Sequence, residues 1–410
     1  DLPSVIVTAG PCYAQIKPNE SKELRQQFLR GEITERQLIE GTLKYYTGPG
    51  ICPFLGTANT MGALCESLGM MLPGGSLIPS STSMRRFSAR ESGRAVMKMV
   101  EMQIRPSQIM TREALKNTIT LLSAIGGSLN ALIHLPALAA ELGISLDWDD
   151  FSKITTTTPV LCSIVPNGNR TVVDLHCAGG IPAVMKELES VMNKDVLTVT
   201  GETLGQILER TPQGDREVIK SMDEPVSRAD GIQVLYGNLA PQGALVKTSA
   251  VPTEVRRFKG TARVFEGEDE CYAAFRAKEI KEGDAVIVRY EGPKGGPGMK
   301  ELHRITEIIK GIPNTAVITD GRFSGASGGL SIGYLCPEAA DGGPIALVRD
   351  GDRITVDLYK DYLHLEVSDE ELEARRREWK AVTRPREKGL LGRYARLVNT
   401  ARSGAALNRE

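Results

Sequence analysis

The second half of this chain is a series of short β-rich runs broken by Gly, Asp and Pro. β-Branched and aromatic residues favour strands, whereas Gly, Asp and Pro favour the turns between them. Many short strands with frequent turn signals are typical of a barrel or a sandwich. The runs are GIQVLYGNLA, GALVKTSAV, GTARVFEG, GDAVIVRYEG, NTAVITDG, GPIALVRDGD and RITVDL, and they predict a β-barrel-like domain over residues 225–410.

The first half has a different pattern, in which short apolar runs alternate with helical periods. Val5-Ile6-Val7 is interpreted as a buried parallel strand, and residues 60–72 have apolar side chains at helical spacing. Residues 111–142 predict two helices separated by Gly126-Gly127-Ser128. This alternation predicts an α/β domain over residues 1–208.

With 410 residues, the chain is too long for one ordinary core, so two domains are expected. The polar residues 209–224 are interpreted as the linker between them. The chain opens DLPSVIVTAGP without Met, and a fully buried strand rarely begins a native protein, because parallel strands need neighbours. We therefore expect earlier residues to precede this sequence and the first domain to be incomplete in it.

Composition limits the function classes. Hydrophobic residues make up 41% of the chain, charged residues make up 25%, and the net charge is −1, so nothing global favours nucleic acid. The longest apolar runs, such as residues 131–140, are too short to span a bilayer, and no membrane partner is expected. Seven scattered cysteines form no small-domain disulfide framework, which indicates a reducing compartment with thiols buried or bound to metal.

One cysteine lies in a loop suited to a reactive thiol. GPGICPFLGTANTM, residues 48–61, places Cys52 among Gly and Pro just before a predicted helix N-terminus, where the helix dipole stabilises a thiolate. The alternative is a small buried core residue, which is the commoner role of a cysteine. No CxxC or Cys/His spacing surrounds Cys52, so the local sequence does not define a metal site.

Two glycine-dense loops carry further candidate residues. YEGPKGGPGMKEL, residues 290–302, places Glu291 and Glu301 beside its glycines but lacks P-loop spacing. A carboxylate on such a loop can bind Mg²⁺, the alternative being a solvated surface acid. ITDGRFSGASGG, residues 318–329, contains Ser324 and is not the GxSxG of a hydrolase, the alternative being a hairpin loop with exposed serines.

Taken together, these segments resemble the dehydratase family that includes dihydroxy-acid dehydratase, 6-phosphogluconate dehydratase and several sugar-acid dehydratases. The resemblance covers nearly the whole chain, in order, through DLPSVIVTAGP, GTANTM, GGSLNALIH, LYGNLAPQGALVKTSA, YEGPKGGPGM, DGRFSG and CPEAADGGPIALVRDGD. ITDGRFSG and RYEGPKGGPGM are more similar to the branched-chain dihydroxy-acid branch than to the sugar-acid branch.

The resemblance implies an activity, cofactors and roles for residues. It implies an iron–sulfur- and Mg²⁺-dependent hydro-lyase that converts a 2,3-dihydroxy acid to a 2-keto acid, in branched-chain amino-acid biosynthesis. By motif, Cys52 is a ligand of a [2Fe–2S] or [4Fe–4S] cluster, Glu301 is a Mg²⁺ ligand, and Ser324 is the base that removes the proton at C2. A nearby cation would be needed to lower the pKa of the serine.

The resemblance also predicts a setting for these residues. The active site is expected between the two domains, in a homodimer located in the cytoplasm or, in a eukaryote, in an organelle stroma or matrix. The family's other cluster cysteines and acidic Mg²⁺ ligands lie upstream of the DLPS segment, so we expect the 410 residues alone to be inactive. A sugar-acid dehydratase and a non-catalytic family remnant with a binding role remain as alternatives.

Overall fold

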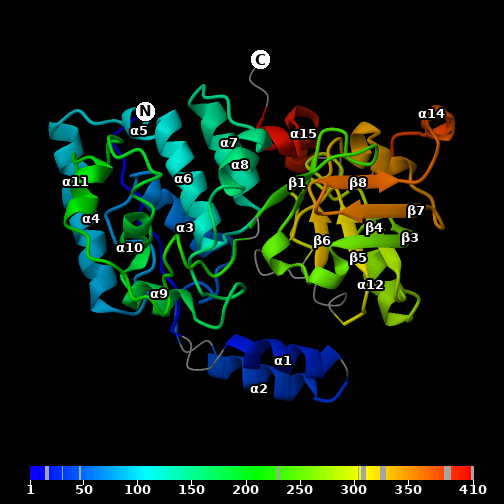
Figure 1. Ribbon diagram of the computed structural model, residues 1–410, viewed down its shortest axis with the longest axis horizontal. Coiled ribbons are helices and arrows are strands. Elements are labelled where there is room, and N and C mark those ends of the chain that lie inside the picture. The colour runs from blue at the N-terminus through cyan, green and yellow to red at the C-terminus, as the bar shows by residue number, and fades with distance from the viewer. Residues whose placement is uncertain are drawn as a thin grey trace. The chain divides into compact units, whose positions relative to one another are not determined.

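The computed structural model describes residues 1–13, 18–29, 31–45, 48–228, 231–302, 304–305, 311–323, 329–382 and 389–407. The chain divides into two compact units, which are treated separately below (Figure 1). The first unit comprises residues 1–128 and 154–229, and the second comprises residues 129–153 and 230–410. Among the described residues, no helix is both long and apolar enough to cross a bilayer.

The regular elements in the described part of the first unit are helices, joined by long irregular segments. Helix α6 illustrates the local signals, because the Thr111 side chain accepts a hydrogen bond from Ala114 N at its start and Gly126 ends it at φ 60°. A Cβ at Gly126 would lie 2.1 Å from Asn167 Nδ2, so only glycine fits there. The helices are α1 (Pro18–Leu29), α2 (Glu35–Tyr45), α3 (Thr57–Ser67), α4 (Ser83–Glu101), α5 (Pro106–Ile109), α6 (Arg112–Ile125), α9 (Val172–Cys177), α10 (Gly180–Glu187) and α11 (Leu204–Glu209).

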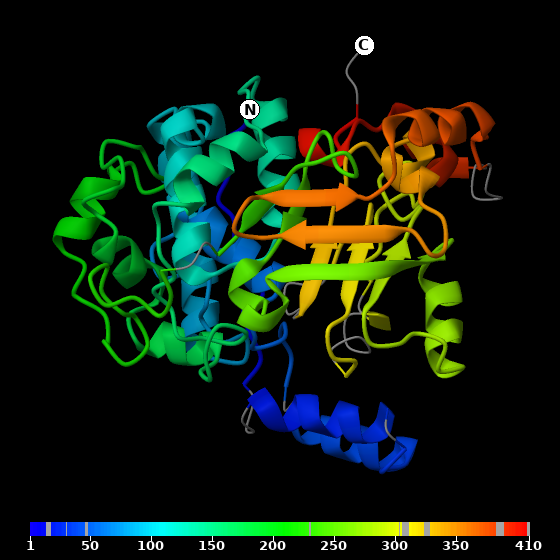
Figure 2. The same ribbon diagram turned by 45° about the vertical axis from the view of Figure 1, so that its right-hand side comes forward.

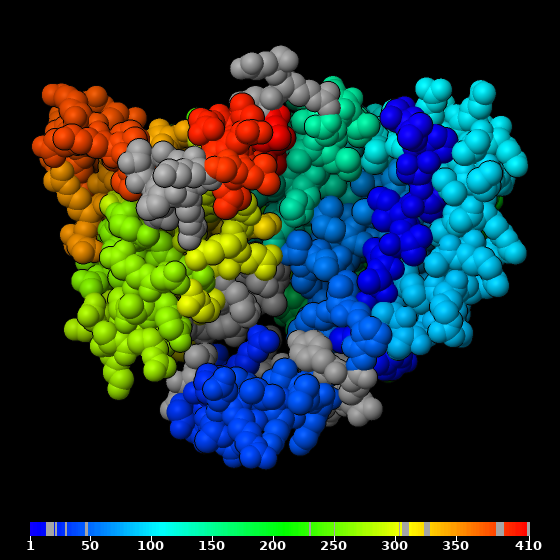
Figure 3. All heavy atoms as spheres, turned by 180° about the vertical axis from the view of Figure 1, so that it is seen from behind, coloured from blue at the N-terminus to red at the C-terminus, as the bar shows by residue number. Residues whose placement is uncertain are grey.

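The expected alternation of strands and helices is wrong for the described part of this unit. Its ladder contacts are isolated bridges, such as Val160 with Ser227 and Cys162 with Ile219. Val5–Val7 is not a buried strand: Ile6 is 38% exposed and Val7 is 41% exposed. Figure 3 shows the first residues, in dark blue, at the surface beside the cyan helices of the same unit. An apolar run indicates burial potential, but a strand also needs a hydrogen-bonded neighbour, and the periodicity does not supply one.

Residues 209–224 are hydrogen-bonded into the first unit. Asp215 N donates to Ala178 O, and Lys220 N donates to Leu161 O. The segment that follows α6 belongs elsewhere, since residues 129–153 group with the second unit. That segment contains α7 (Ala131–Glu141) and the start of α8 (Trp148–Thr155), and Trp148 Nε1 donates to Leu132 O at 3.0 Å.

Within its described residues, the second unit is built on an eight-stranded mixed sheet in the order β1-β2-β6-β5-β4-β3-β7-β8. The neighbours β3–β4, β4–β5 and β5–β6 are parallel and the other neighbours are antiparallel; Figure 2 shows β3, β7 and β8 side by side. The strands are β1 (Gln233–Leu235), β2 (Ala244–Val246), β3 (Arg257–Phe265), β4 (Asp284–Val288), β5 (Ala316–Thr319), β6 (Leu330–Gly333), β7 (Arg353–Asp357) and β8 (Tyr362–Leu365).

The two outer strands of this sheet meet, which confirms the barrel-like prediction. Tyr236, just after β1, forms a parallel bridge with Tyr362, and Leu363 N donates to Tyr236 O at 2.8 Å. Alternate residues of each strand enter one core, for example Ala285 and Ile287 of β4. Val286 and Val288 enter a second cluster together with residues of α12 (Glu268–Arg276). The sheet is therefore nearly closed, and this bridge pairs part of its two outer edges.

One predicted strand is wrong. GPIALVRDGD forms the 3₁₀ helix η4 (Pro344–Leu347), because Pro344 has no N–H for a ladder and Arg289 Nη1 binds the carbonyls of Ile345, Ala346 and Val348. Ser368 caps the start of the next helix, since its side chain accepts a hydrogen bond from Glu371 N. The remaining elements are η1 (Thr248–Ala250), η2 (Thr253–Val255), η3 (Ala339–Asp341), α14 (Asp369–Glu378), α15 (Gly389–Leu397) and η6 (Ala401–Ser403).

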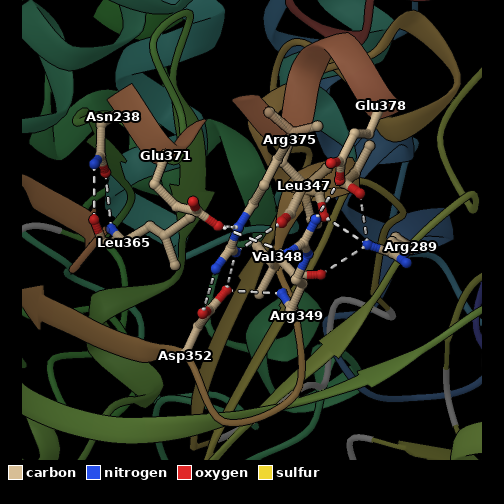
Figure 4. Close-up of polar contacts among 12 residues, drawn as sticks. Asn238, Arg289, Leu347, Val348, Arg349, Asp352, Leu365, Glu371, Arg375 and Glu378 are labelled. Atoms are coloured by element: carbon tan, nitrogen blue, oxygen red, sulfur yellow. Dashed lines mark hydrogen bonds and ion pairs between the residues drawn. The ribbon is translucent and has the colours of Figure 1, made fainter. Parts of the chain in front are cut away.

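Arginine side chains fix the segment after η4 to its neighbours. Arg375 of α14 contacts both oxygens of Asp352, at 2.6 and 3.0 Å, and also donates to Leu347 O. Arg289 follows β4 and reaches the same segment, as Figure 4 shows. Because Arg289 directly precedes Tyr290, the start of the glycine-rich loop is anchored to the barrel.

Candidate active site

Buried Asp320 organises the first half of the glycine-rich loop, residues 290–299. It follows β5 and is fully buried. Its two oxygens accept hydrogen bonds from the backbone N–H groups of Tyr290 and Glu291, at 3.1 and 3.0 Å, and from Ala339 N at 2.9 Å. One carboxylate therefore ties the ends of two parallel strands to the segment after β6.

Glu338 does the same for the second half of the loop. It accepts from Lys294 N at 2.9 Å and from Gly295 N at 2.8 Å. The glycines are required by this close wrapping, because a Cβ at Gly292 would lie 2.6 Å from Glu338 Oε2 and one at Gly295 would lie 2.8 Å from Tyr290 Cα. The glycine-rich loop therefore encloses the Glu338 side chain of its own unit.

Both carboxyl groups resist ionisation. Burial raises the pKa of Asp320 to about 6, although its backbone donors oppose the shift. Burial, followed by the negative charge of Asp320, raises the pKa of Glu338 to about 8. In the folded protein Glu338 is therefore mostly protonated at neutral pH, so these two groups are structural supports of the loop.

Substitution of Glu338 tests this role. Near pH 4, where the Glu338 carboxyl is protonated in both the folded and the unfolded chain, Glu338→Gln should change the free energy of unfolding by less than about 1 kcal/mol, because a neutral amide still offers an oxygen to Lys294 N and Gly295 N. Glu338→Ala should cost about 2–4 kcal/mol, because two enclosed N–H groups lose their acceptor. Urea unfolding of the two variants measures the difference, and equal losses would contradict the assignment.

Glu338→Gln should also change how the free energy of unfolding depends on pH. Below about pH 4.5 the Glu338 carboxyl is protonated in both the folded and the unfolded chain. Between about pH 4.5 and 8 it ionises in the unfolded chain but stays protonated in the folded chain, whose Glu338 pKa is about 8. Wild-type stability should therefore fall as pH rises through this window. Glu338→Gln should remove the fall between about pH 6 and 8 and leave the part below about pH 6 that belongs to Asp320.

Glu301 lies directly after the loop and beside the segment that follows Asp320. Glu301 and Arg322 form a parallel bridge, and Leu302 N donates to Arg322 O at 2.9 Å. The Arg322 side chain donates to Met299 O. The two glycine-dense loops are thus connected through backbone and side-chain hydrogen bonds. Glu301 is half-buried, so its carboxylate is within reach of a small solute.

Asn130 holds the Glu301 carboxylate in place. It precedes α7 and is fully buried. Its Nδ2 donates to Glu301 Oε1 at 3.0 Å and to Phe323 O at 3.2 Å. Its Oδ1 accepts from Tyr334 Oη at 2.6 Å and from Arg322 Nη1 at 3.3 Å. A single amide therefore joins α7, both loops and the end of β6, and the acceptor side fixes which way its donor points.

His134 lies one helical turn beyond Asn130, and the charges of Arg322 and Glu301 affect its pKa. Burial lowers its pKa, the positive charge of Arg322 lowers it further, and the carboxylate of Glu301 opposes them. The imidazole is therefore favoured in its neutral form.

The structure says less about the other two predicted site residues, Ser324 and Cys52. Ser324 lies outside the described residues, which reach Phe323 and resume at Gly329. Cys52 is exposed and without a disulfide, in a loop of the first unit that precedes α3. Asn59 of α3 donates to the carbonyls of Cys52 and Phe54, at 2.7 and 2.8 Å, and so shapes the loop. An accessible thiol before a helix agrees with the predicted local setting.

A metal group needs more donors than either residue supplies. Within the described ranges, no three side chains of His, Cys, Asp or Glu come together as a metal site. Cys52 offers sulfur, which suits an iron–sulfur cluster, and Glu301 offers oxygen, which suits Mg²⁺. Each residue is chemically appropriate as one ligand of its group.

Two functional candidates escaped the sequence analysis. Asn130 and Lys247 appeared there only within the quoted motifs GGSLNALIH and LYGNLAPQGALVKTSA. Lys247 is buried at the end of β2, and burial lowers its pKa to about 7. The apolar run that precedes Lys247 gave a signal of burial, because a strand that is buried on both faces encloses the residue at its end as well.

Comparisons with known proteins place this geometry in a family. The model for the N-terminal domain of the dihydroxy-acid/6-phosphogluconate dehydratases matches residues 1–207, and the model for the C-terminal domain matches residues 217–405. The N-terminal match does not support the expectation of an incomplete first domain. The presence of both matches likewise does not support the expectation that these 410 residues are inactive.

Individual relatives agree with the family models. The chain is 44% identical to the dihydroxy-acid dehydratase of Acetivibrio thermocellus over 418 residues, covering 99% of this chain and 76% of that protein. It is also 44% identical to the dihydroxy-acid dehydratase of Ignicoccus hospitalis and to that of Moorella thermoacetica, with the same coverage. The chain belongs to the dihydroxy-acid/6-phosphogluconate dehydratase family.

Proposed function

We propose that this protein is a hydro-lyase that dehydrates a 2,3-dihydroxy carboxylic acid to a 2-keto acid, as a step of branched-chain amino-acid biosynthesis. The observation that carries the proposal is 44% identity, over 99% of the chain, to proteins named dihydroxy-acid dehydratase. In this reaction the C2 proton leaves, its electron pair forms a C2–C3 double bond, and the C3 hydroxyl departs as water. The enol then tautomerises to the 2-keto acid.

The residues have separate roles in this proposal. Ser324 removes the C2 proton, Cys52 is one ligand of an iron–sulfur cluster, and Glu301 is one ligand of Mg²⁺. When bound, these groups would act as Lewis acids on substrate oxygens. Asn130 keeps the Glu301 carboxylate oriented through the 3.0 Å bond, and Arg322 and Tyr334 keep Asn130 oriented in turn. Asp320 and Glu338 shape the loop from which Glu301 emerges.

The experiment that tests the function is a substrate panel. The protein, with its iron, sulfide and Mg²⁺ contents measured, is incubated with 2,3-dihydroxyisovalerate, pentonates and hexonates, and 2-keto acid formation is followed. Preference for 2,3-dihydroxyisovalerate supports the proposal. The family also includes 6-phosphogluconate dehydratase, so preference for an aldonate would assign the sugar-acid branch instead. No product from any substrate by the metal-loaded protein would favour a non-catalytic family member.

The Mg²⁺ role of Glu301 predicts a specific defect. Glu301→Gln keeps an oxygen that can accept from Asn130 Nδ2 but removes the charge that a hard cation requires. The Mg²⁺ concentration for half-maximal activity should rise by about tenfold or more, since each lost charge–metal contact is worth at least about 1.4 kcal/mol.

Glu291 supplies the matched control for this test. It lies on the same loop, is only 2% exposed, and accepts from Glu268 N at 3.0 Å. Glu291→Gln should lower stability without moving the Mg²⁺ activation curve. The assignment would be reversed if the curve moved for Glu291→Gln and stayed in place for Glu301→Gln.

A further inference from the structure

Two cysteines of the first unit lie on chain segments that are paired through their backbones. Pro11 and Ile51 form a parallel bridge. It is made by two hydrogen bonds, from Cys12 N to Ile51 O at 2.8 Å and from Ile51 N to Gly10 O at 3.0 Å. Cys12 and Cys52 are the next residues on the two segments, so they occupy equivalent positions in the parallel register.

The register places the two thiols close together. In parallel pairing, equivalent residues on adjacent segments project to the same side, with backbones about 4.8 Å apart. Disulfides in proteins join Cα atoms that are about 4.4–6.8 Å apart, so this spacing is suitable. Gly50 permits the close approach, because its φ is +127° and a Cβ there would lie 2.6 Å from Cys12 N.

The bridge between Pro11 and Ile51 therefore carries the placement of the two thiols. Neither cysteine is in a disulfide in this structure.

The two thiols differ in solvent exposure, so they can react one after the other with an oxidant. Cys52 is exposed, whereas Cys12 is 0% exposed. An oxidant in solution therefore meets Cys52 first. Redox-sensitive cysteines are often solvent-accessible and lie beside a second cysteine that resolves the oxidised form.

We propose that Cys52 and Cys12 form a peroxide-sensitive thiol pair. The Cys52 thiolate attacks hydrogen peroxide, the O–O bond breaks, and a sulfenic acid and hydroxide result. The Cys12 sulfur then attacks the Cys52 sulfur, a disulfide forms, and the sulfenic oxygen leaves as water with the thiol proton. Two thiols are oxidised and one peroxide is reduced. The disulfide occupies the Cys52 sulfur and prevents it from binding metal.

The test maps oxidised cysteines in the full 410-residue chain. After incubation with a chelator and then with hydrogen peroxide, remaining thiols are blocked and the digest is analysed by mass spectrometry. The expected product is a Cys12–Cys52 linked peptide pair that reductant separates. This mapping needs no variant and no catalytic activity, so its outcome is independent of the proposed function.

Two variants sharpen the result. In Cys12→Ser, Cys52 should lose its resolving partner and accumulate as sulfenic and sulfinic acid, detected with a sulfenic-acid probe. In Cys65→Ser, the matched control from the neighbouring helix α3, the Cys12–Cys52 link should persist. A wild-type protein in which Cys52 reaches sulfinic acid as fast as in Cys12→Ser would overturn the proposal. A link from Cys52 to Cys65 or to another chain would also overturn it.

Discussion

Replacing Ser324 by Ala should lower the rate of dehydration about 10²–10⁴-fold, the usual effect of losing a general base. The proposed reaction needs one group to accept the C2 proton, and the serine of DGRFSG is the residue that the family resemblance assigns to that step. The measurement is kcat/KM for the preferred dihydroxy acid, with iron and Mg²⁺ contents matched to the wild type.

The matched control for this variant is Ser327→Ala, which removes a hydroxyl from the same glycine-dense loop. It should keep activity within a few-fold of the wild type. The two variants should also share the same thermal midpoint, so that a difference in rate is not a difference in folding. A Ser324→Ala protein that retains more than about a tenth of the wild-type rate would show that another group is the base.

The sequence was a good guide to elements whose signals are local. The β-branched runs of β4 and β5 were predicted as strands, and the two helices on either side of residues 126–128 were predicted as α6 and α7 are found. Such signals depend on residues a few positions apart. Closure of the barrel was expected only in outline, because the bridge between Tyr236 and Tyr362 joins positions that no local pattern connects.

The failures have a common physical cause. Val5–Val7 has strand composition but does not form a strand, although Ile6 N donates to Met70 O at 2.8 Å. The run at Pro344 became η4 because distant Arg289 binds its carbonyls. The role of Asn130 was missed for the same reason. Its partners Glu301 and Phe323 are separated from it by 171 and 193 positions, respectively. Motifs indicated which loops matter, whereas the residue that joins them could be identified only in three dimensions.

Asn130→Asp should have the largest effect of any single change within the described site. The substitution keeps the shape and the acceptor for Tyr334 Oη, but it removes both N–H donors and places a carboxylate 3.0 Å from Glu301. The carbonyl of Phe323 also loses its bond to this side chain. The free energy of unfolding should fall by about 3 kcal/mol or more, because a buried like-charge contact adds to the lost hydrogen bonds.

Tyr334→Phe is the matched control, because it removes one bond to Asn130 and leaves its donors in place. It should cost only about 1 kcal/mol. The pH dependence of the stability loss distinguishes the effect of the introduced charge from that of altered packing. Lowering the pH protonates the introduced carboxyl, restores an O–H donor toward Glu301 and relieves the repulsion, so Asn130→Asp should recover part of its loss in acid, whereas Tyr334→Phe should not. If both variants lost the same stability at every pH, the Asn130 amide would not be orienting Glu301 through its donors.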